Sequence, residues 1–400
     1  MKPRTLLFIT VFNSILGLSV LFPVLPPLGR HLGLTELQIG SLSTSYALMQ
    51  FLVSPFWGRR SERVGRKPIL VTGILGFSLS FLGFAVVAQL GLSGVLGVWG
   101  VYGLLLAARI FGGTFSSATL PTAQAYIADT TGREDRTAGM ALIGAAFGLG
   151  IVFGPAIGAG LATISLLAPV YFSAAFALLN GIFVMALVPE PKRHVAQAPP
   201  KRASSVATRV WPLLFVGLAV SLASVAMEQT IAFYYQDRLQ LLPEQTARTV
   251  GIALVCYGVV AVFVQGFLVR RAGLAPLSLL RFGVPIALVG FVFLVFAHQF
   301  ATLTVALAIQ GFGQGLALPG VSAALSLAVA DNEQGAVAGL NSSATALGRM
   351  LGPVVGTSLY QLHPEYPYGF SAILLVLVIV FLIAYRQAPA LRNQTTETQS

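Results

Sequence analysis

The sequence predicts an all-α integral membrane protein, with twelve transmembrane helices arranged as two pseudo-symmetric six-helix bundles. Of the 400 residues, 56% are hydrophobic and only 9% are charged, whereas soluble domains carry about 25% charged residues. Long apolar runs follow one another along nearly the whole chain, each close to the roughly 20 residues that a helix needs to cross the hydrocarbon. A basic, proline-rich segment separates the first six runs from the last six.

The twelve spans are predicted from the positions of these apolar runs. They lie at residues 6–28, 37–57, 68–90, 95–118, 137–163, 167–188, 211–235, 246–269, 275–297, 300–329, 335–361 and 367–385. The first run is too long for the apolar core of a cleavable signal peptide and has no small-residue cleavage site, so it is interpreted as the first helix.

The distribution of Lys and Arg predicts the orientation. If the N-terminus is cytoplasmic, eighteen of the 24 cations lie in inside segments and three in outside loops, while Arg109, Arg281 and Arg349 fall within spans. An excess on the cytoplasmic side is the positive-inside rule, so we expect both termini in the cytoplasm. The same rule accounts for a pI near 10.2, and nucleic acid is therefore not expected as a partner.

The segment PEPKRHVAQAPPKRASSVATR (189–209) is rich in proline and cations, which is typical of a linker that does not pack. It predicts the domain organisation of the chain. We expect an N-terminal six-helix bundle at 1–188, a cytoplasmic linker at 189–210, a C-terminal six-helix bundle at 211–386 and a cytoplasmic tail at 387–400.

The two halves also echo each other. GIVFGPAIG (150–158) in the fifth span matches GRMLGPVVG (348–356) in the eleventh, with Gly, Gly-Pro and Gly in register. Internal duplication is typical of transporters whose halves move about a central site. Glycine at every fourth position leaves one helix face nearly bare and allows close packing. In the fifth span the residues expected in this packing are Gly150, Gly154, Pro155 and Gly158.

The loop GRRSERVGRKP (58–68) joins the second and third spans with five cations and one acid, Glu62. One interpretation is positive charge on the cytoplasmic side and nothing more. In the other, the glycines give a tight turn, and Glu62 caps the N-terminus of a neighbouring helix or pairs with a cation across the bundle.

Two of the charged residues that fall within spans, Arg109 and Glu228, are candidates for a functional role. An arginine such as Arg109, roughly in the middle of the fourth span, costs about 3 kcal/mol on insertion scales. The charge of this arginine must be compensated by neighbouring groups unless the side chain reaches the membrane–water interface. Glu228, in VAMEQTIAFYY (225–235), is the one acid of thirteen inside a span. A carboxyl group removed from water binds its proton more tightly, so Glu228 can serve as a proton-exchanging group that also attracts cations. The alternative is a protonated packing residue.

Around Glu228 we expect an apolar, aromatic-rich surface with a few amides, as in small-molecule pockets. The candidate cavity residues are Ile15, Tyr46, Gln50, Phe115, Phe233, Tyr234, Gln310, Gln314 and Asn341. The single cysteine, Cys256, is interpreted as a small buried hydrophobe. No metal site and no cofactor is expected.

Several stretches together resemble the drug:proton antiporter family of the major facilitator superfamily, and within it bacterial exporters of tetracyclines and fluoroquinolones. They are LSVLFPVLPPL (18–28), YALMQFLVSPFWG (46–58), AYIAD (125–129), FGLGIVFGPAIG (147–158) and AGLNSSATALGRMLGP (338–353). The resemblance implies the major facilitator fold, a monomer in a bacterial-type inner membrane, and proton-coupled efflux of small amphipathic drugs or metabolites by alternating access.

The resemblance also implies roles for residues. Arg109 takes the place of an arginine tied to proton relay, Glu228 that of a coupling glutamate, and GxxxGPxxG that of an antiporter packing motif. Loop 58–68 is similar to the family's signature loop, with Glu62 for the usual Asp, and implies a gating latch. The gating residues would be Gly58, Glu62, Arg63, Gly65, Arg66, Lys67, Asp129 and Arg136. Ser14 and Gly315 stand where relatives have acids, so one coupled proton or none is expected.

Other interpretations remain open from the sequence. A protein of the same fold could export a specific metabolite, such as a sugar or a metal chelator, or could carry its substrate without proton coupling. A membrane enzyme or a sensor is disfavoured, because the chain shows no phosphate-binding loop, no HExxH motif and no catalytic or output domain. GFGQG (311–315) lies within an apolar span and lacks the preceding strand of a dinucleotide site.

Overall fold

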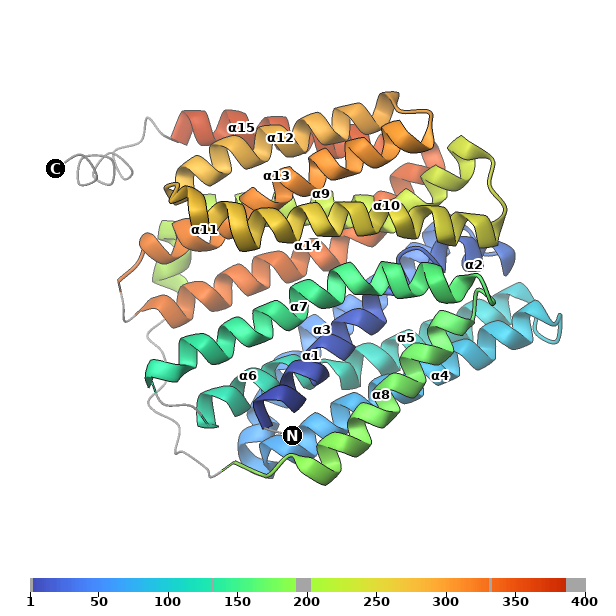
Figure 1. The fold of residues 1–400 in the computed structure, drawn as a ribbon, viewed down its shortest axis with the longest axis horizontal. Helices are drawn as coiled ribbons and strands as arrows, with labels where there is room; N and C mark the ends of the chain where they lie inside the picture. Colours follow the sequence, from blue (N-terminus) through green and yellow to red (C-terminus); the bar gives the residue numbers. More distant parts are fainter. Residues whose placement is uncertain (1–2, 131–132, 192–202, 331–332, 386–400) are drawn as a thin grey trace.

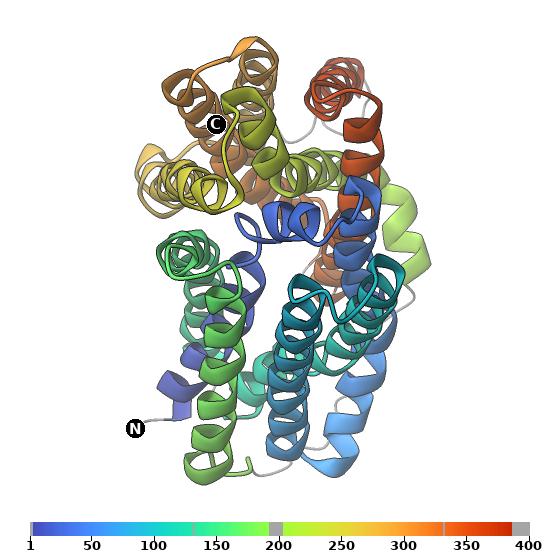
Figure 2. The ribbon, with the colours of Figure 1, turned by 90° about the vertical axis from the view of Figure 1, so that its right-hand side faces the viewer.

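The structure is a computed structural model that describes residues 3–130, 133–191, 203–330 and 333–385. In this part of the chain all regular structure is helical, as predicted. The N-terminal half contains α1 (Pro3–Ser19), α2 (Leu25–His31), α3 (Glu36–Val64), α4 (Arg66–Leu92), α5 (Val98–Ser116), α6 (Thr119–Thr130), α7 (Arg133–Ala162) and α8 (Ala168–Leu187). Apart from α2, these helices form the lower group in Figures 1 and 2.

The C-terminal half forms the upper group in the same views. It contains α9 (Ala203–Leu239), α10 (Pro243–Phe263), a π-helical turn η1 (Val264–Leu268), α11 (Val269–Ala272), α12 (Pro276–Phe296), α13 (Phe300–Leu327), α14 (Gln334–Leu362) and α15 (Tyr366–Tyr385). Half of the predicted linker (192–202 of 189–210) and all of the predicted tail (387–400) lie outside the described residues.

Each predicted span coincides with helix, but three differ in form. The first is two helices, α1 and α2, separated by a turn at residues 20–24, because Pro23, Pro26 and Pro27 lack the N–H groups that a continuous helix requires. The fourth continues past a short turn at Ser117 into α6. The eighth ends in η1 and α11 rather than in one regular helix.

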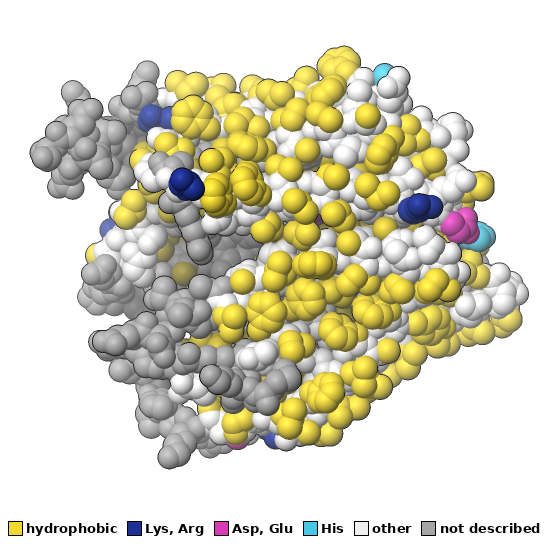
Figure 3. Space-filling view, in the orientation of Figure 1, with side chains coloured by type: hydrophobic (Ala, Val, Ile, Leu, Met, Phe, Trp, Pro, Cys, Tyr) yellow, Lys and Arg dark blue, Asp and Glu magenta, His cyan; other side chains and the backbone are white. Residues whose placement is uncertain are grey.

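Nine helical segments of the described chain are long and apolar enough to cross a membrane, and Thr5–Ser19 is a shorter apolar helix. Helices α3 and α14 have 29 residues each but are more polar. They pack on each other between the halves, where a Cβ added to Gly40 would lie 2.9 Å from the carbonyl oxygen of Pro353. Figure 3 shows hydrophobic side chains over most of one face, with charged groups toward its two ends.

The glycines of the fifth span hold α7 against α1. A Cβ at Gly150 would lie 2.8 Å from the Cβ of Ile15, and one at Gly158 would lie 2.6 Å from the carbonyl oxygen of Val20. A Cβ at Gly154 would overlap the Ser19 side chain, whose hydroxyl donates to the carbonyl oxygen of Gly150 at 2.7 Å. The bare face predicted from the sequence is therefore the contact surface between these two helices.

The matching glycines of the eleventh span hold α14 against α9 in the same way. A Cβ at Gly348 would lie 2.7 Å from that of Ser221, and one at Gly352 would lie 2.7 Å from that of Val225. The helix pairs α1–α7 and α9–α14 are thus equivalent in the two halves. The second contact between the halves, α7 with α10, is also close, since a Cβ at Gly258 would lie 3.0 Å from Val152.

Candidate functional site

A cavity of about 480 Å³ lies between the two halves. Helices α1, α3, α5 and α7 contribute to its wall from the N-terminal half, and α9, α10, α13 and α14 from the C-terminal half. Its lining is mainly apolar, with a small number of charged and amide side chains, which is the composition expected of a small-molecule site.

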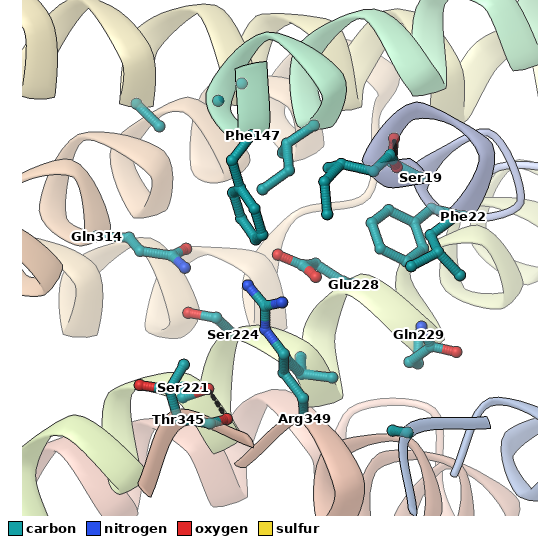
Figure 4. Close-up of a pocket in the computed structure, with 18 of the residues that line it drawn as sticks. Ser19, Phe22, Phe147, Ser221, Ser224, Glu228, Gln229, Gln314, Thr345 and Arg349 are labelled. Atoms are coloured by element: carbon teal, nitrogen blue, oxygen red, sulfur yellow. Dashed lines mark hydrogen bonds between the residues drawn. The ribbon is translucent and has the colours of Figure 1, made fainter. Parts of the chain in front are cut away.

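Glu228 of α9 and Arg349 of α14 face each other across this lining (Figure 4). The two side chains interact electrostatically. Within the described chain, however, none of the ion pairs closer than 4.0 Å joins them. The guanidinium of Arg349 lies 4.9 Å from the ring centre of Phe147 on α7, and its side chain is exposed although it lies inside the bundle. Arg349 therefore presents its charge to the cavity.

Two further polar side chains complete the surroundings of Glu228. The hydroxyl of Tyr257, on α10, donates a hydrogen bond to the amide oxygen of Gln314 and also interacts with the Glu228 carboxyl group. Gln314 in turn accepts from Gln310 at 3.4 Å. Glu228 is thus placed among a cation, a phenol and an amide.

Arg109 of α5 also borders the cavity, but it is enclosed. Only 3% of the residue is exposed. Its guanidinium lies 5.5, 5.4 and 5.0 Å from the ring centres of Tyr46, Phe81 and Phe84, and its Nε has no hydrogen-bond partner among the residues that the structure describes. Ring faces attract cations, so these three aromatic side chains supply the compensation that the sequence required for this charge.

Four predicted cavity residues line the cavity together with Glu228 and Arg109, namely Ile15, Tyr46, Gln50 and Gln314. Gln50 donates to the hydroxyl of Ser116 at 3.3 Å, and that hydroxyl also pairs with Tyr46 at 2.5 Å. These amide and phenol groups are therefore held in place on the N-terminal wall.

Five predicted cavity residues lie elsewhere. Phe233 packs with Tyr360, Tyr234 donates to the carbonyl oxygen of Leu294, Phe115 packs on Trp57 and Phe111, Gln310 is buried beside Ser224, and Asn341 donates to Ser322. Helical periodicity explains why Phe233 and Tyr234 do not line the cavity. At about 100° per residue, positions five and six after Glu228 lie on other faces of α9.

Sequence reasoning did not identify Arg349 as a site residue. The signal was present, since it is an arginine within a span, directly after the first glycine of the eleventh-span repeat. Cys256 was interpreted wrongly: it is exposed rather than buried. Residues 254 and 258 of α10 are buried, and each is about 160° around the helix from Cys256 at 100° per residue, so Cys256 lies on the other side of the helix.

The predicted gating loop is an ion-paired turn. Arg66 pairs with Asp129 at 2.8 Å and donates to Ser61 at 2.6 Å. Gly65, with φ of +124°, makes the turn between α3 and α4, whereas Gly58 lies inside α3 with open space around it. The tight turn predicted from both glycines is therefore formed by one.

The capping role considered for Glu62 belongs to another acid. Glu190, just after α8, accepts hydrogen bonds from the backbone N–H groups of Arg66 at 2.6 Å and Lys67 at 2.9 Å. Glu62 is exposed in the last turn of α3. The side chain of Arg136 lies outside the described residues, and Arg63 has an interaction partner of its own.

At the opposite end of the molecule, Arg30 on α2 joins the halves. It pairs with Asp237 of α9 at 2.5 Å and with Glu36 of α3 at 2.7 Å. Tyr360 of α14 donates to the same Asp237 at 2.6 Å. Figure 2 shows α2 between the two groups of helices. We call these four residues the Arg30 latch; the sequence analysis did not identify it.

Comparison with known proteins places these features in a family. The model of the Major Facilitator Superfamily matches residues 7–297 and 214–399. The chain is 28% identical over 398 residues to Multidrug resistance protein 1 of Bacillus subtilis, which covers 98% of both chains. It is 26% identical over 401 residues to Quinolone resistance protein NorA of Staphylococcus aureus, covering 98% of this chain and 99% of the relative.

Solved structures share the architecture. A bacterial homolog of the human lysosomal transporter Spinster, in an inward-facing and unoccupied conformation, superposes with a TM-score of 0.76 at 14% identity over 96% of each chain. The human organic anion transporter MFSD10 superposes with a TM-score of 0.67 at 22% identity, over 95% of this chain and 98% of its own. At such identities the likeness concerns the fold alone.

Proposed function

Because this chain belongs to the major facilitator superfamily, a superfamily of multi-pass membrane transporters, we propose that it exports small amphipathic compounds in exchange for protons. The observation that carries the proposal is a carboxyl group, Glu228, in the wall of a cavity that both halves form. The names of its relatives, which refer to multidrug and quinolone resistance, support this choice of cargo.

The exchange follows from competition at one group. When Glu228 is ionised it attracts a cationic part of a cargo molecule, and when it is protonated it does not. Binding of cargo from the cytoplasm therefore requires loss of the proton, and uptake of a proton from outside releases the cargo. When the cargo carries no net charge, the entering proton moves one net charge across the membrane, and 100 mV then supplies about 2.3 kcal/mol to this cycle.

Alternating access requires the halves to close at one end at a time. We propose that the Arg30 latch holds them together at the outer end, as the positive-inside rule assigns it, and that this conformation is the one closed toward the outside. In this proposal, residues 1–188 and 211–386 are the two moving bundles, 189–210 is the cytoplasmic linker and 387–400 the cytoplasmic tail. The protein works as a monomer in the bacterial inner membrane with both termini in the cytoplasm.

The other residues of the predicted site receive roles in the same cycle. Arg109 takes part in proton relay next to Tyr46. The loop between α3 and α4, with Arg66 and Asp129, forms the cytoplasmic gate, and the glycines of α7 keep this helix packed on α1. These roles rest on the contacts described above and on the resemblance noted in the sequence.

The test is transport in liposomes that contain a pH-sensitive dye. A proton gradient is imposed and a panel of lipophilic cations and fluoroquinolones is added to wild type, Glu228→Gln and Glu244→Gln. Glutamine keeps the shape of the side chain and removes its charge. Glu244 is exposed at the start of α10, so the same change there is a matched control.

We expect coupled movement of protons and cargo for wild type and for Glu244→Gln, and at least a tenfold loss for Glu228→Gln. Equal cargo movement by wild type and Glu228→Gln without proton flux would contradict the proposal. The protein would then be an uncoupled facilitator, and Glu228 a packing residue.

A further inference from the structure

The two walls of the cavity carry different side chains at positions that the internal duplication makes equivalent. Ile15 and Ser19 contact the glycines of α7 as Ser221 and Val225 contact those of α14. Ser221 of α9 comes 206 positions after Ile15 of α1, and Val225 comes 206 positions after Ser19. This separation makes Phe22 the counterpart of Glu228.

The same comparison applies to the glycine-bearing helices. Ile151 follows Gly150 as Arg349 follows Gly348, so Ile151 is the counterpart of Arg349. Both residues border the cavity, as do Phe22 and Glu228. Equivalent positions thus carry two apolar side chains on the N-terminal wall and two opposite charges on the C-terminal wall.

Arg349 is the cation that a cargo can reach. Its side chain is exposed to the cavity, its described contact is the ring of Phe147, and no carboxylate lies within 4.0 Å of its nitrogens in the described chain. Arg109 is 3% exposed and surrounded by rings. A guanidinium offers five N–H donors in a planar fork that matches a carboxylate.

The charge balance decides which cargo fits. A cargo with a single positive charge would occupy Glu228 and leave the Arg349 charge uncompensated, and removal of one partner of a buried charge pair is costly. A cargo with a single negative charge at Arg349 would favour protonated Glu228 and would travel with the proton rather than against it. A zwitterion satisfies both side chains and adds no net charge.

From this arrangement we propose that Glu228 and Arg349 form a headgroup subsite for the ammonium and carboxylate of a zwitterionic amphiphile, whose apolar part lies on Phe22 and Ile151. This inference rests on the proposed function and adds the chemical class and the orientation of the cargo. A proton and the cargo ammonium compete for Glu228, while Arg349 selects for the carboxylate. Tyr257, which also faces Glu228, can donate to either occupant of that position.

The experiment compares two probes that differ in one group: a fluoroquinolone with a free carboxylate and a free amine, and its methyl ester, which keeps the amine. Binding to purified protein in lipid nanodiscs is measured by ligand fluorescence, and proton-driven export is measured separately in liposomes. The variants are Arg349→Gln, Arg349→Lys and, at the counterpart position, Ile151→Ala.

We expect wild type to bind the acid at least tenfold more tightly than the ester, since a hydrogen-bonded charge pair changes affinity by about ten- to a hundredfold. The Arg349→Gln variant should lose this preference, and its affinity for the ester should stay within about threefold of the wild-type affinity. Arg349→Lys should restore part of the preference, because it keeps the charge without the fork. Ile151→Ala should weaken the binding of both probes equally. Thermal unfolding of each variant identifies any loss of folded protein.

The outcomes separate this inference from the proposed function. Acid selectivity that depends on Arg349, without proton-driven export, supports the subsite and contradicts the proposed function. If both probes are exported in a proton-driven manner and Arg349→Gln does not change the selectivity, the proposed function is supported and the subsite is contradicted. If wild type binds neither probe, or prefers the ester, the headgroup subsite is wrong.

Discussion

Single residues show how closely the membrane helices of this protein approach. Glycine at 150, 154 and 158 removes the side chains that would separate α7 from α1, and the carbonyl oxygen of Gly150 is close enough to accept a hydrogen bond from Ser19. In a bilayer, where helices gain little from leaving lipid for one another, such close packing is a main source of association. The positions of Glu228 and Arg349 across the cavity depend on the equivalent contact between α14 and α9.

One substitution tests this packing. Gly154→Ala would place a methyl group against Ser19, and overpacking of this kind costs about 1–3 kcal/mol. We expect the unfolding temperature in detergent, followed by tryptophan fluorescence, to fall by several degrees. Gly160→Ala on the same helix meets open space and should leave it unchanged or slightly raised, because alanine favours helix. Similar unfolding temperatures for the two variants would refute the packing role of Gly154.

At the scale of helices, the start of α4 is capped by a residue that is distant in sequence. Helix α4 begins immediately after Gly65, and its first N–H groups have no partner within the helix. Glu190 from beyond α8 supplies both oxygens of its carboxylate to these groups. A negative charge at this position also interacts favourably with the helix dipole. The start of α4 is therefore tied to the end of α8 within the N-terminal half.

The loss of this cap should be measurable. Glu190→Ala removes two hydrogen-bond acceptors from the start of α4, and removal of an N-cap costs about 1 kcal/mol. We expect faster hydrogen exchange at the backbone amides of Arg66, Lys67 and Ile69 and a lower unfolding temperature. Glu62→Ala removes an exposed acid from the adjacent helix end and should change neither quantity. An equal response to both substitutions would mean that the effect is one of loop charge.

For the whole molecule, the Arg30 latch is the strongest polar connection between the halves in the described chain. Burial by itself lowers the pKa of Arg30, but hydrogen bonds and charges from Asp237 and Glu36 raise it above its usual value. The guanidinium therefore stays charged at any physiological pH. The latch includes residues of α2, α3, α9 and α14, so it must open before the cavity can face the other side.

Removal of the latch should shift the conformational equilibrium. In a Cys256→Ser background with Phe22→Cys as a reporter in the cavity, Arg30→Gln should increase labelling by a membrane-impermeant maleimide added outside about three- to tenfold. This corresponds to the loss of partly exposed ion pairs. Arg248→Gln removes an exposed arginine of α10, which the proposed orientation also assigns to the outside, and should not change the rate. Unchanged labelling of the Arg30 variant would show that the latch does not hold this end closed.

The sequence by itself determined the class of protein, the positions of the spans and the duplication. These are properties of local composition: a helix must be apolar over about 20 residues to remain in hydrocarbon, and close helix contact needs small residues at fixed intervals. The same local rules identified Glu228 and Arg109 as unusual, because a charge within an apolar run is costly wherever the helix packs.

The tertiary structure decided which charges meet. Arg349 faces Glu228, Glu190 caps α4, and Arg30 reaches Asp237 only after helices distant in sequence are packed at particular rotations. A difference of one or two residues around a helix moves a side chain to another face, as Phe233 and Tyr234 illustrate. Hydropathy carries no information on that rotation, so the partner of each charge had to come from the packed molecule.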